Sequence, residues 1–275
     1  MLWLPIIFLA LTILVVVAAF ALMFCSVAFA GWSGGVVRPA SAGWEVPALS
    51  GERLRTWAAN VARRVVARHA RQPRSAETPL AIATELEAGA NAVLEQAARR
   101  MHSDVAKTCP NTRPRQITVT APEVFAITAE LERNYPKSEL QLIREIAVSN
   151  ARRARSVAAE EFPQTGINCP LRTKDGHCLT FLSRPITCRR LCSSCPCDGN
   201  GSCHDAEKAS AYWAVGVAEQ LHEGMSDGLS EGLHQAGLDD GVYELNDALA
   251  TALATPHAAS RWSRGEMVFA NCAKA

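Results

Sequence analysis

The sequence lacks both a strong charge bias and the familiar catalytic motifs. Its 275 residues carry 28 Lys and Arg against 27 Asp and Glu, a net charge of +1. A chain balanced in this way shows no global preference for nucleic acid, and we expect no nucleic-acid partner. It also contains no G-x-S-x-G, Walker, G-x-G-x-x-G or H-E-x-x-H pattern. The usual signatures of hydrolases, nucleotide-binding enzymes and zinc proteases are therefore missing, and the sequence identifies no catalytic residue.

Charge is absent altogether from residues 1–37, which begin MLWLPIIFLALTILVVVAAFALMFC. A helix needs about 20 apolar residues to cross a bilayer. A secretory signal has a basic start and an apolar stretch of about 7–15 residues, whereas this run has no basic start and is longer. The run predicts a transmembrane helix over residues 1–30. The triplet Ala28-Phe29-Ala30 resembles a cleavage site, so a cleaved signal is the alternative.

Arginines are concentrated directly after this run. Residues 38–74 contain eight arginines against two glutamates, a local balance of 8 − 2 = +6. Lys and Arg near a span tend to stay in the cytoplasm, which predicts a single-pass protein of the inner (cytoplasmic) membrane with its soluble domain inside. Within this region, residues 51–72 form an amphipathic pattern with Leu54, Trp57, Val61 and Val65 on one stripe. Such a helix either lies on an anionic membrane surface or packs on the soluble domain.

The remaining chain has the patterns of helices. The run QITVT, residues 116–120, is short and β-like, and Thr120 with Glu123 forms a capping box that predicts a helix start. Ser138 with Gln141 repeats that signature. Apolar residues recur every four positions from Trp213 to Leu233, and residues 239–253 are predicted as a further helix. The predicted fold class is mainly α: a transmembrane helix (1–30), a linker with a basic helix (31–80) and a helical domain with a loop-rich cysteine cluster (81–275).

Residues 168–205 show no helical or strand period and are rich in cysteine, glycine and proline. Eight of the ten cysteines are candidate ligands of a metal: Cys109, Cys169, Cys178, Cys188, Cys192, Cys195, Cys197 and Cys203. Thiolates bind zinc or iron–sulfur clusters in reducing compartments, and form disulfides in oxidising ones. Because the arginines favour a cytoplasmic domain, we expect zinc or an iron–sulfur cluster. His177 and His204 each adjoin a cysteine and are further candidates, and Arg184 and Arg189 bring positive charge that stabilises thiolates.

Three short patterns carry a resemblance to a known family. They are Cys169-Pro170, then Gly176-His177-Cys178, then Arg184-Pro185-Ile186-Thr187-Cys188-Arg189. Together they resemble the signature of the YkgJ-like cysteine-cluster family, a zinc- or iron-chelating group related to flagellin lysine methylase. The resemblance extends over residues 105–270. It implies that Cys169, Cys178 and Cys188 are ligands of one site, with Cys109 as the fourth, where that family's first cysteine cluster lies.

These observations lead to three functional hypotheses. The first is a membrane-anchored protein that binds zinc or an iron–sulfur cluster in a structural, redox or metal-handling role; Cys192, Cys195, Cys197 and Cys203 then form a second site or supply spare ligands. By resemblance, the second is an enzyme that modifies protein lysines with the help of the cluster. The third is an exported domain held together by disulfides. The membrane is the one partner that the sequence predicts.

Overall fold

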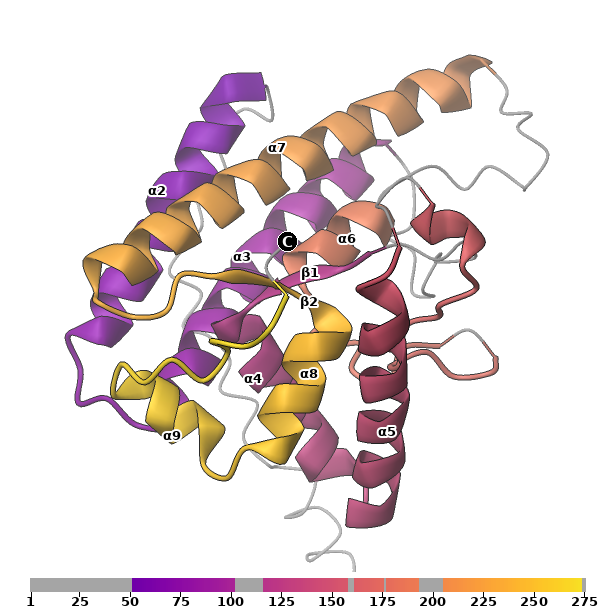
Figure 1. Ribbon diagram of the computed structural model, residues 1–275. Coiled ribbons are helices and arrows are strands. Elements are labelled where there is room, and N and C mark those ends of the chain that lie inside the picture. Colours follow the sequence, from indigo (N-terminus) through magenta and orange to yellow (C-terminus); the bar gives the residue numbers. More distant parts are fainter. Residues whose placement is uncertain (1–50, 102–115, 158–160, 176, 193–204, 274–275) are drawn as a thin grey trace, which may run out of the picture. The chain divides into compact units, whose positions relative to one another are not determined.

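The computed structural model describes residues 51–101, 116–157, 161–175, 177–192 and 205–273 (Figure 1). The chain divides into two compact units, Met1–Gly43 and Trp44–Ala275, and all the described residues belong to the second. This part of the chain is mainly α, as predicted. Its elements in order are α2 (Gly51–Ala70), α3 (Glu77–Met101), β1 (Thr118–Thr120), α4 (Ala121–Asn134), α5 (Lys137–Ala154), η1 (Phe162–Gln164), α6 (Ile186–Cys192), α7 (Asp205–Gln235), β2 (Val242–Glu244), α8 (Leu245–Ala254) and α9 (Ala258–Ser263).

The predicted transmembrane helix requires a correction. No helix within the described residues is long and apolar enough to cross a bilayer. Residues 1–30, where the span was predicted, lie outside the described residues. We therefore correct the fold class to a helical unit with a small two-stranded sheet, and we withdraw the single-pass location in the cytoplasmic membrane.

The segment predicted as irregular, residues 168–205, contains the short helix α6. Two further local predictions were wrong because the chain uses other start signals. Residues 242–244, predicted as helix, form β2, which pairs antiparallel with β1 so that Thr118 faces Glu244. Helix α8 begins only after Glu244, whose carboxylate accepts a hydrogen bond from the Asp247 amide at 3.0 Å. Helix α5 begins at Lys137 after the extended Pro136, so Ser138 lies inside the first turn and does not cap it. Proline disfavours helical backbone in the residue before it, which separates α4 from α5 at this point.

Helix α2 packs along α7, and Figure 1 shows the two side by side. Leu54, Val61 and Val65 are buried there. From the sequence, this helix could lie on a membrane surface or pack on the soluble domain, and the structure supports packing. The contact is close because α7 carries glycine where the backbones meet. A Cβ atom built at Gly228 would overlap the carbonyl oxygen of Ala59, and one at Gly224 would overlap that of Arg55.

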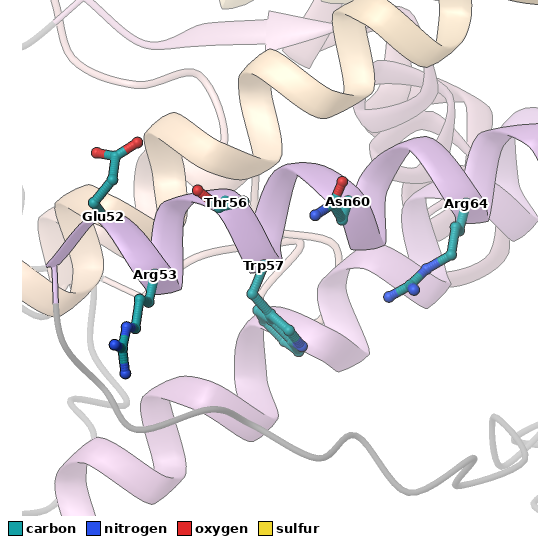
Figure 2. A pocket seen from close by; sticks show the side chains of 6 residues that line it. All are labelled: Glu52, Arg53, Thr56, Trp57, Asn60 and Arg64. Atoms are coloured by element: carbon teal, nitrogen blue, oxygen red, sulfur yellow. The ribbon is translucent and has the colours of Figure 1, made fainter.

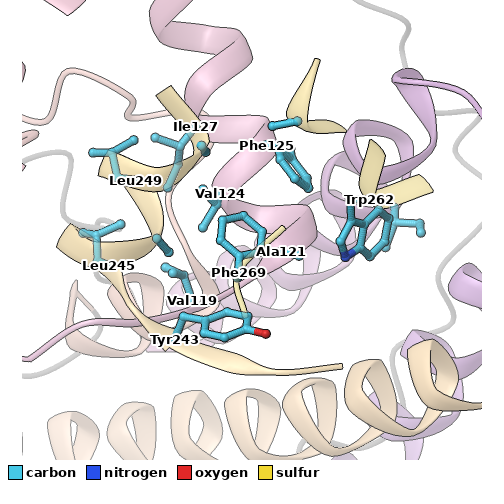
Figure 3. Close-up of a cluster of buried hydrophobic side chains, with 14 of the residues drawn as sticks. Val119, Ala121, Val124, Phe125, Ile127, Tyr243, Leu245, Leu249, Trp262 and Phe269 are labelled. Carbon is cyan, nitrogen blue, oxygen red and sulfur yellow. The ribbon is translucent and has the colours of Figure 1, made fainter. Parts of the chain in front are cut away.

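The main core lies between α4, α8, the sheet and the C-terminal segment (Figure 3). Phe125 packs against Trp262 and Phe269, with ring centroids 5.9 Å and 5.5 Å apart. Tyr243 of β2 packs on Phe269 at 5.2 Å, and its hydroxyl donates a 2.7 Å hydrogen bond to Asp239. The amide of Gly241 also donates to Asp239, at 3.0 Å, so this acidic residue shapes the turn before β2.

Candidate functional site

The cysteine segment, residues 161–192, crosses one side of this core with little regular structure. Cys169, Cys178 and Cys188 are all half-buried and pack against the main core. Cys169 lines a small cavity of about 10 Å³ together with Asn168 and Asn246. The other predicted ligands fall outside this description: Cys109, Cys195, Cys197, Cys203 and His204 lie outside the described residues, and the side chain of Cys192 is not described.

Cys178 sits in a tight local hairpin. The backbone of Cys178 forms an isolated β-bridge with Arg172, and the Leu179 amide donates to the Leu171 carbonyl at 2.8 Å. The Cys178 Sγ atom lies 3.9 Å from the Thr180 hydroxyl. The neighbouring His177 is exposed. The hairpin therefore brings Cys178 to the core while its tip, including His177, faces solvent.

Buried carboxylates of α4 hold the next part of the segment. Glu123 Oε2 accepts hydrogen bonds from the Thr120 amide and hydroxyl, both at 2.8 Å, which is the capping contact that the sequence predicted. Its other oxygen accepts the Ile186 amide at 2.8 Å. Two turns later in α4, Glu130 Oε2 accepts the Ser183 amide at 2.9 Å. Two buried carboxylates thus fix the backbone just before Cys188.

Two buried arginines of the segment itself bind carbonyl groups of the same stretch. Arg189 donates to the carbonyls of Arg184 and Leu182, at 2.9 Å and 2.8 Å, and to the side chain of Asn91 on α3. Arg184 donates to the Phe181 carbonyl at 3.2 Å and lies over the Phe181 ring, 3.9 Å from its centroid. The sequence predicted that these arginines stabilise thiolates. That stays a prediction, and the contacts that the structure shows are hydrogen bonds to carbonyl groups of the turn between Cys178 and Cys188.

Glu87 of α3 completes a buried charge cluster, which we define as Glu87, Glu123, Glu130, Arg184 and Arg189. Each of the five residues is at most 8% exposed. Glu87 Oε2 lies 3.6 Å from Arg189 Nη2, and Glu87 Oε1 is buried without a hydrogen-bond partner among the described residues. Burial raises the pKa of Glu87 to about 8, outweighing the attraction of Arg189. Burial has this effect because it penalises the charged form of a carboxyl group more than its neutral form.

This arrangement fixes the position of the backbone of the cysteine segment. The oxygen atoms of Glu123 and Glu130 that bind the segment are directed at amide groups of the turn over residues 183–186. Beyond the turn, α6 packs on α7, where the Thr187 hydroxyl lies 3.1 Å from His222 Nε2 and 3.1 Å from the Thr118 hydroxyl. Helix α6 is short, and these contacts give it a fixed position. The cluster and α7 together therefore determine where Cys188 lies.

The prediction that this region contains a metal-binding group requires a correction. Within the described residues, no three or more His, Cys, Asp or Glu side chains are grouped so that they could hold a metal ion. Cys169, Cys178 and Cys188 do not make up such a group by themselves. Any metal site built on them needs ligands from the part of the chain that is not described, where five of the predicted cysteine ligands lie or have their side chains.

Sequence reasoning missed Glu87 and Glu130, and it treated Glu123 only as a cap. A signal was present for two of them. Glu87 follows the buried Ile82, Ala83 and Leu86, and Glu130 follows Ile127 by three positions, so both lie on the apolar side of their helices. An acidic residue on an apolar face is rarely buried without a partner. The partners themselves, a backbone amide 53 positions from Glu130 and the Arg189 side chain beside Glu87, leave no trace in the local pattern.

Comparison with known proteins gave no relative. No protein-family model, no curated protein and no solved structure matches the chain. The resemblance to the YkgJ-like family accordingly stays a prediction from the three short patterns.

Proposed function

We propose that this chain binds a metal through cysteine thiolates, as zinc or an iron–sulfur cluster. The site joins cysteines of the described segment to cysteines from residues 109 and 192–203. Thiolate sulfur is the ligand that both zinc and iron–sulfur clusters take. The density of cysteines in residues 169–203 supports the proposal, and so does the absence of helical or strand period there.

The observation that carries the proposal is the anchoring of the segment. A loop with little apolar surface does not order itself, and metal binding often supplies the missing free energy. Here four buried side chains, those of Glu123, Glu130, Arg184 and Arg189, bind the backbone of one irregular stretch. Burying charge costs several kcal/mol per ion, and hydrogen bonds only partly offset this. This cost supports a functional role for the fixed position of Cys188, in addition to its contribution to stability.

The test is anaerobic purification followed by metal analysis and an absorption spectrum. We expect zinc or iron with sulfide in the wild-type protein, and thiolate-to-metal charge-transfer bands after replacement of zinc by cobalt. Cys178→Ser and Cys188→Ser should each lower the metal content. Cys272→Ser is the matched control, because Cys272 is a buried thiol whose Sγ atom lies 3.2 Å from the Thr251 hydroxyl.

Two results would contradict the proposal. One is a wild-type protein that is metal-free after anaerobic purification and takes up neither zinc nor iron on reconstitution. The other is full metal content in both Cys178→Ser and Cys188→Ser.

A further inference from the structure

Two hollows among the described residues differ in what surrounds them. One, of about 380 Å³, lies on α2 beside Arg53, Trp57 and Arg64 (Figure 2). Its lining residues are exposed except for Trp57, which packs against the core. The other is the small cavity beside Cys169, and one of its lining residues, Asn246, is only 5% exposed. A buried amide needs hydrogen-bond partners, and the partners found here connect Cys169 to two helices.

The first of these helices is α5, which carries Asn150 on its buried face beside the apolar Ala147 and Ala151. Helix α5 packs on α8, and Figure 1 shows the two side by side. Asparagine is unfavourable inside a helix and is mostly exposed in proteins. Both hydrogen atoms of this amide are used, because Asn150 Nδ2 donates to the Asn168 carbonyl at 2.9 Å and to Asn246 Oδ1 at 3.1 Å. These bonds offset the cost of burying a polar side chain.

Glu244, at the start of α8, fixes the direction of the bonds and is 3% exposed. Its Oε1 atom accepts a hydrogen bond from Asn246 Nδ2 at 2.6 Å, and its Oε2 atom accepts the Asp247 amide at 3.0 Å. A carboxylate accepts hydrogen bonds and does not donate them, so the NH₂ group of Asn246 faces Glu244 and its oxygen atom faces Asn150. Asn150 must therefore donate on both sides. We define Asn150, Asn246 and Glu244 as the buried amide network.

The network acts on the backbone of Cys169. The Asn168 carbonyl belongs to the peptide bond whose nitrogen atom is that of Cys169. Because a peptide bond is planar, a hydrogen bond to this oxygen atom restricts the orientation of the backbone that enters Cys169. The carbonyl of Cys169 itself accepts the Arg172 amide at 3.1 Å. Both peptide planes next to this cysteine are therefore held, one by α5 and the other by the hairpin that contains Cys178.

We propose that Asn150 is the positioning residue of Cys169, and that Asn246 and Glu244 hold Asn150 in the orientation that this requires. The inference rests on the proposed metal site, in which Cys169 is a ligand. It gives Cys169 a support separate from the carboxylates that hold the turn before Cys188. Hydrogen-bonded groups behind a metal ligand set its orientation, and their loss typically lowers metal affinity by about 10–100-fold.

The first measurement compares alkylation rates of single cysteines by mass spectrometry, in the full-length protein after removal of metal. Leucine is similar in size to asparagine and donates no hydrogen bond, so Asn150→Leu leaves the Asn168 carbonyl without this donor. We expect Cys169 to react about tenfold faster than in the wild type, because a buried carbonyl without a partner favours local opening. The rate of Cys178 should change much less. A general loss of stability would raise both rates together.

The second measurement is a double-mutant cycle, read out by titration of the full-length protein with Co²⁺ in reducing, anaerobic buffer. In the natural background, Asn150→Leu should weaken Co²⁺ binding by about 10–100-fold. In a Cys169→Ser background it should have no further effect, because it acts through that thiol. Gly228→Ala is the matched control, since its added methyl group meets Ala59 between α2 and α7, and this variant should bind Co²⁺ like the wild type.

Three results would overturn the proposal. They are an unchanged alkylation rate of Cys169 in Asn150→Leu, an equal acceleration of Cys169 and Cys178, and an equal loss of Co²⁺ affinity with and without the Cys169 thiol. If Asn150→Leu does not fold, Asn246→Ala decides, because it removes the second bond of Asn150 and should give the same pattern at smaller size. A wild type that takes up no Co²⁺ would contradict the metal-binding proposal, whereas the alkylation rates would still decide this one.

Discussion

In the α2–α7 pair, helix backbone meets helix backbone through glycine, whereas in the cysteine segment the backbone is held by buried carboxylate and guanidinium groups. The helix pair satisfies its own backbone hydrogen bonds, so it needs only a close fit between two surfaces. The segment has few internal hydrogen bonds, so its amides and carbonyls need partners from elsewhere. Charged side chains of α4 and of the segment itself supply them. The same unit is thus stabilised by close packing between α2 and α7, and by hydrogen bonds to buried charged groups in the cysteine segment.

We expect the largest change in the free energy of unfolding from a substitution between α2 and α7. Gly228→Ala places a methyl group on the Ala59 carbonyl, which is backbone and cannot rotate away. The helices must separate, and we expect a loss of about 3 kcal/mol in the free energy of unfolding. Chemical denaturation measures it.

Gly216→Ala in the same helix is the control, because nothing lies within 4 Å of its added Cβ atom. Alanine is favoured over glycine inside helices, so this variant should gain about 0.5–1 kcal/mol. Equal effects at positions 216 and 228 would show that the close contact contributes nothing.

The next effect is on the anchor of the cysteine segment. Glu123→Gln directs an amide NH₂ group at an amide or hydroxyl donor, so that a buried donor loses its acceptor. We expect a loss of about 2–3 kcal/mol, together with faster alkylation of Cys178 and Cys188 at a denaturant concentration where the fold persists. Glu132→Gln, on the exposed side of α4, should change neither quantity. Unchanged thiol reactivity in Glu123→Gln would mean that this carboxylate does not hold the segment.

The proton on Glu87 makes the free energy of unfolding depend on pH. Glu87 has a pKa of about 8 in the folded protein against an ordinary value of 4.5, so between these values the native state holds one proton more than the unfolded state. The free energy of unfolding therefore falls as pH rises through this window. The slope is at most about 1.4 kcal/mol per pH unit, or about 2 kcal/mol from pH 6 to pH 7.5.

Glu87→Gln should remove this contribution to the slope of the free energy of unfolding against pH. The contributions of the other titratable groups should stay unchanged. Denaturation of both proteins at several pH values measures the difference. Parallel curves for the two proteins would show that Glu87 is ionised in the native state.

The smallest effect is expected for the ion pairs at the edge of the helix pair. Arg63 and Glu231 are 36% and 48% exposed, and water screens their attraction. Arg63→Gln should cost less than about 1 kcal/mol, and less again in high salt. A loss as large as that of Gly228→Ala would mean that charge, and not close packing, holds α2 on α7.

Much of the helical architecture was readable from local patterns. The four-residue spacing of Val217, Leu221, Met225 and Leu229 predicted their burial in α7, and all four are buried. The Thr120–Glu123 signature predicted the start of α4 and one contact of its carboxylate. The spacing Gly224-x₃-Gly228-x₃-Gly232 was equally visible and predicts a close helix contact, but its meaning depends on which helix lies opposite.

By itself, the sequence determined where most of the helices form and that Cys169 and Cys178 lie in an irregular segment, because hydrophobic period and capping are properties of near neighbours. The tertiary structure decided what holds that segment. Glu123 binds an amide 63 positions away, Glu130 one 53 positions away, and Glu87 lies next to an arginine from another element. No local pattern encodes these pairs, since the cost of burying each charge and the bond that offsets it come from parts of the chain that meet only when the helices pack.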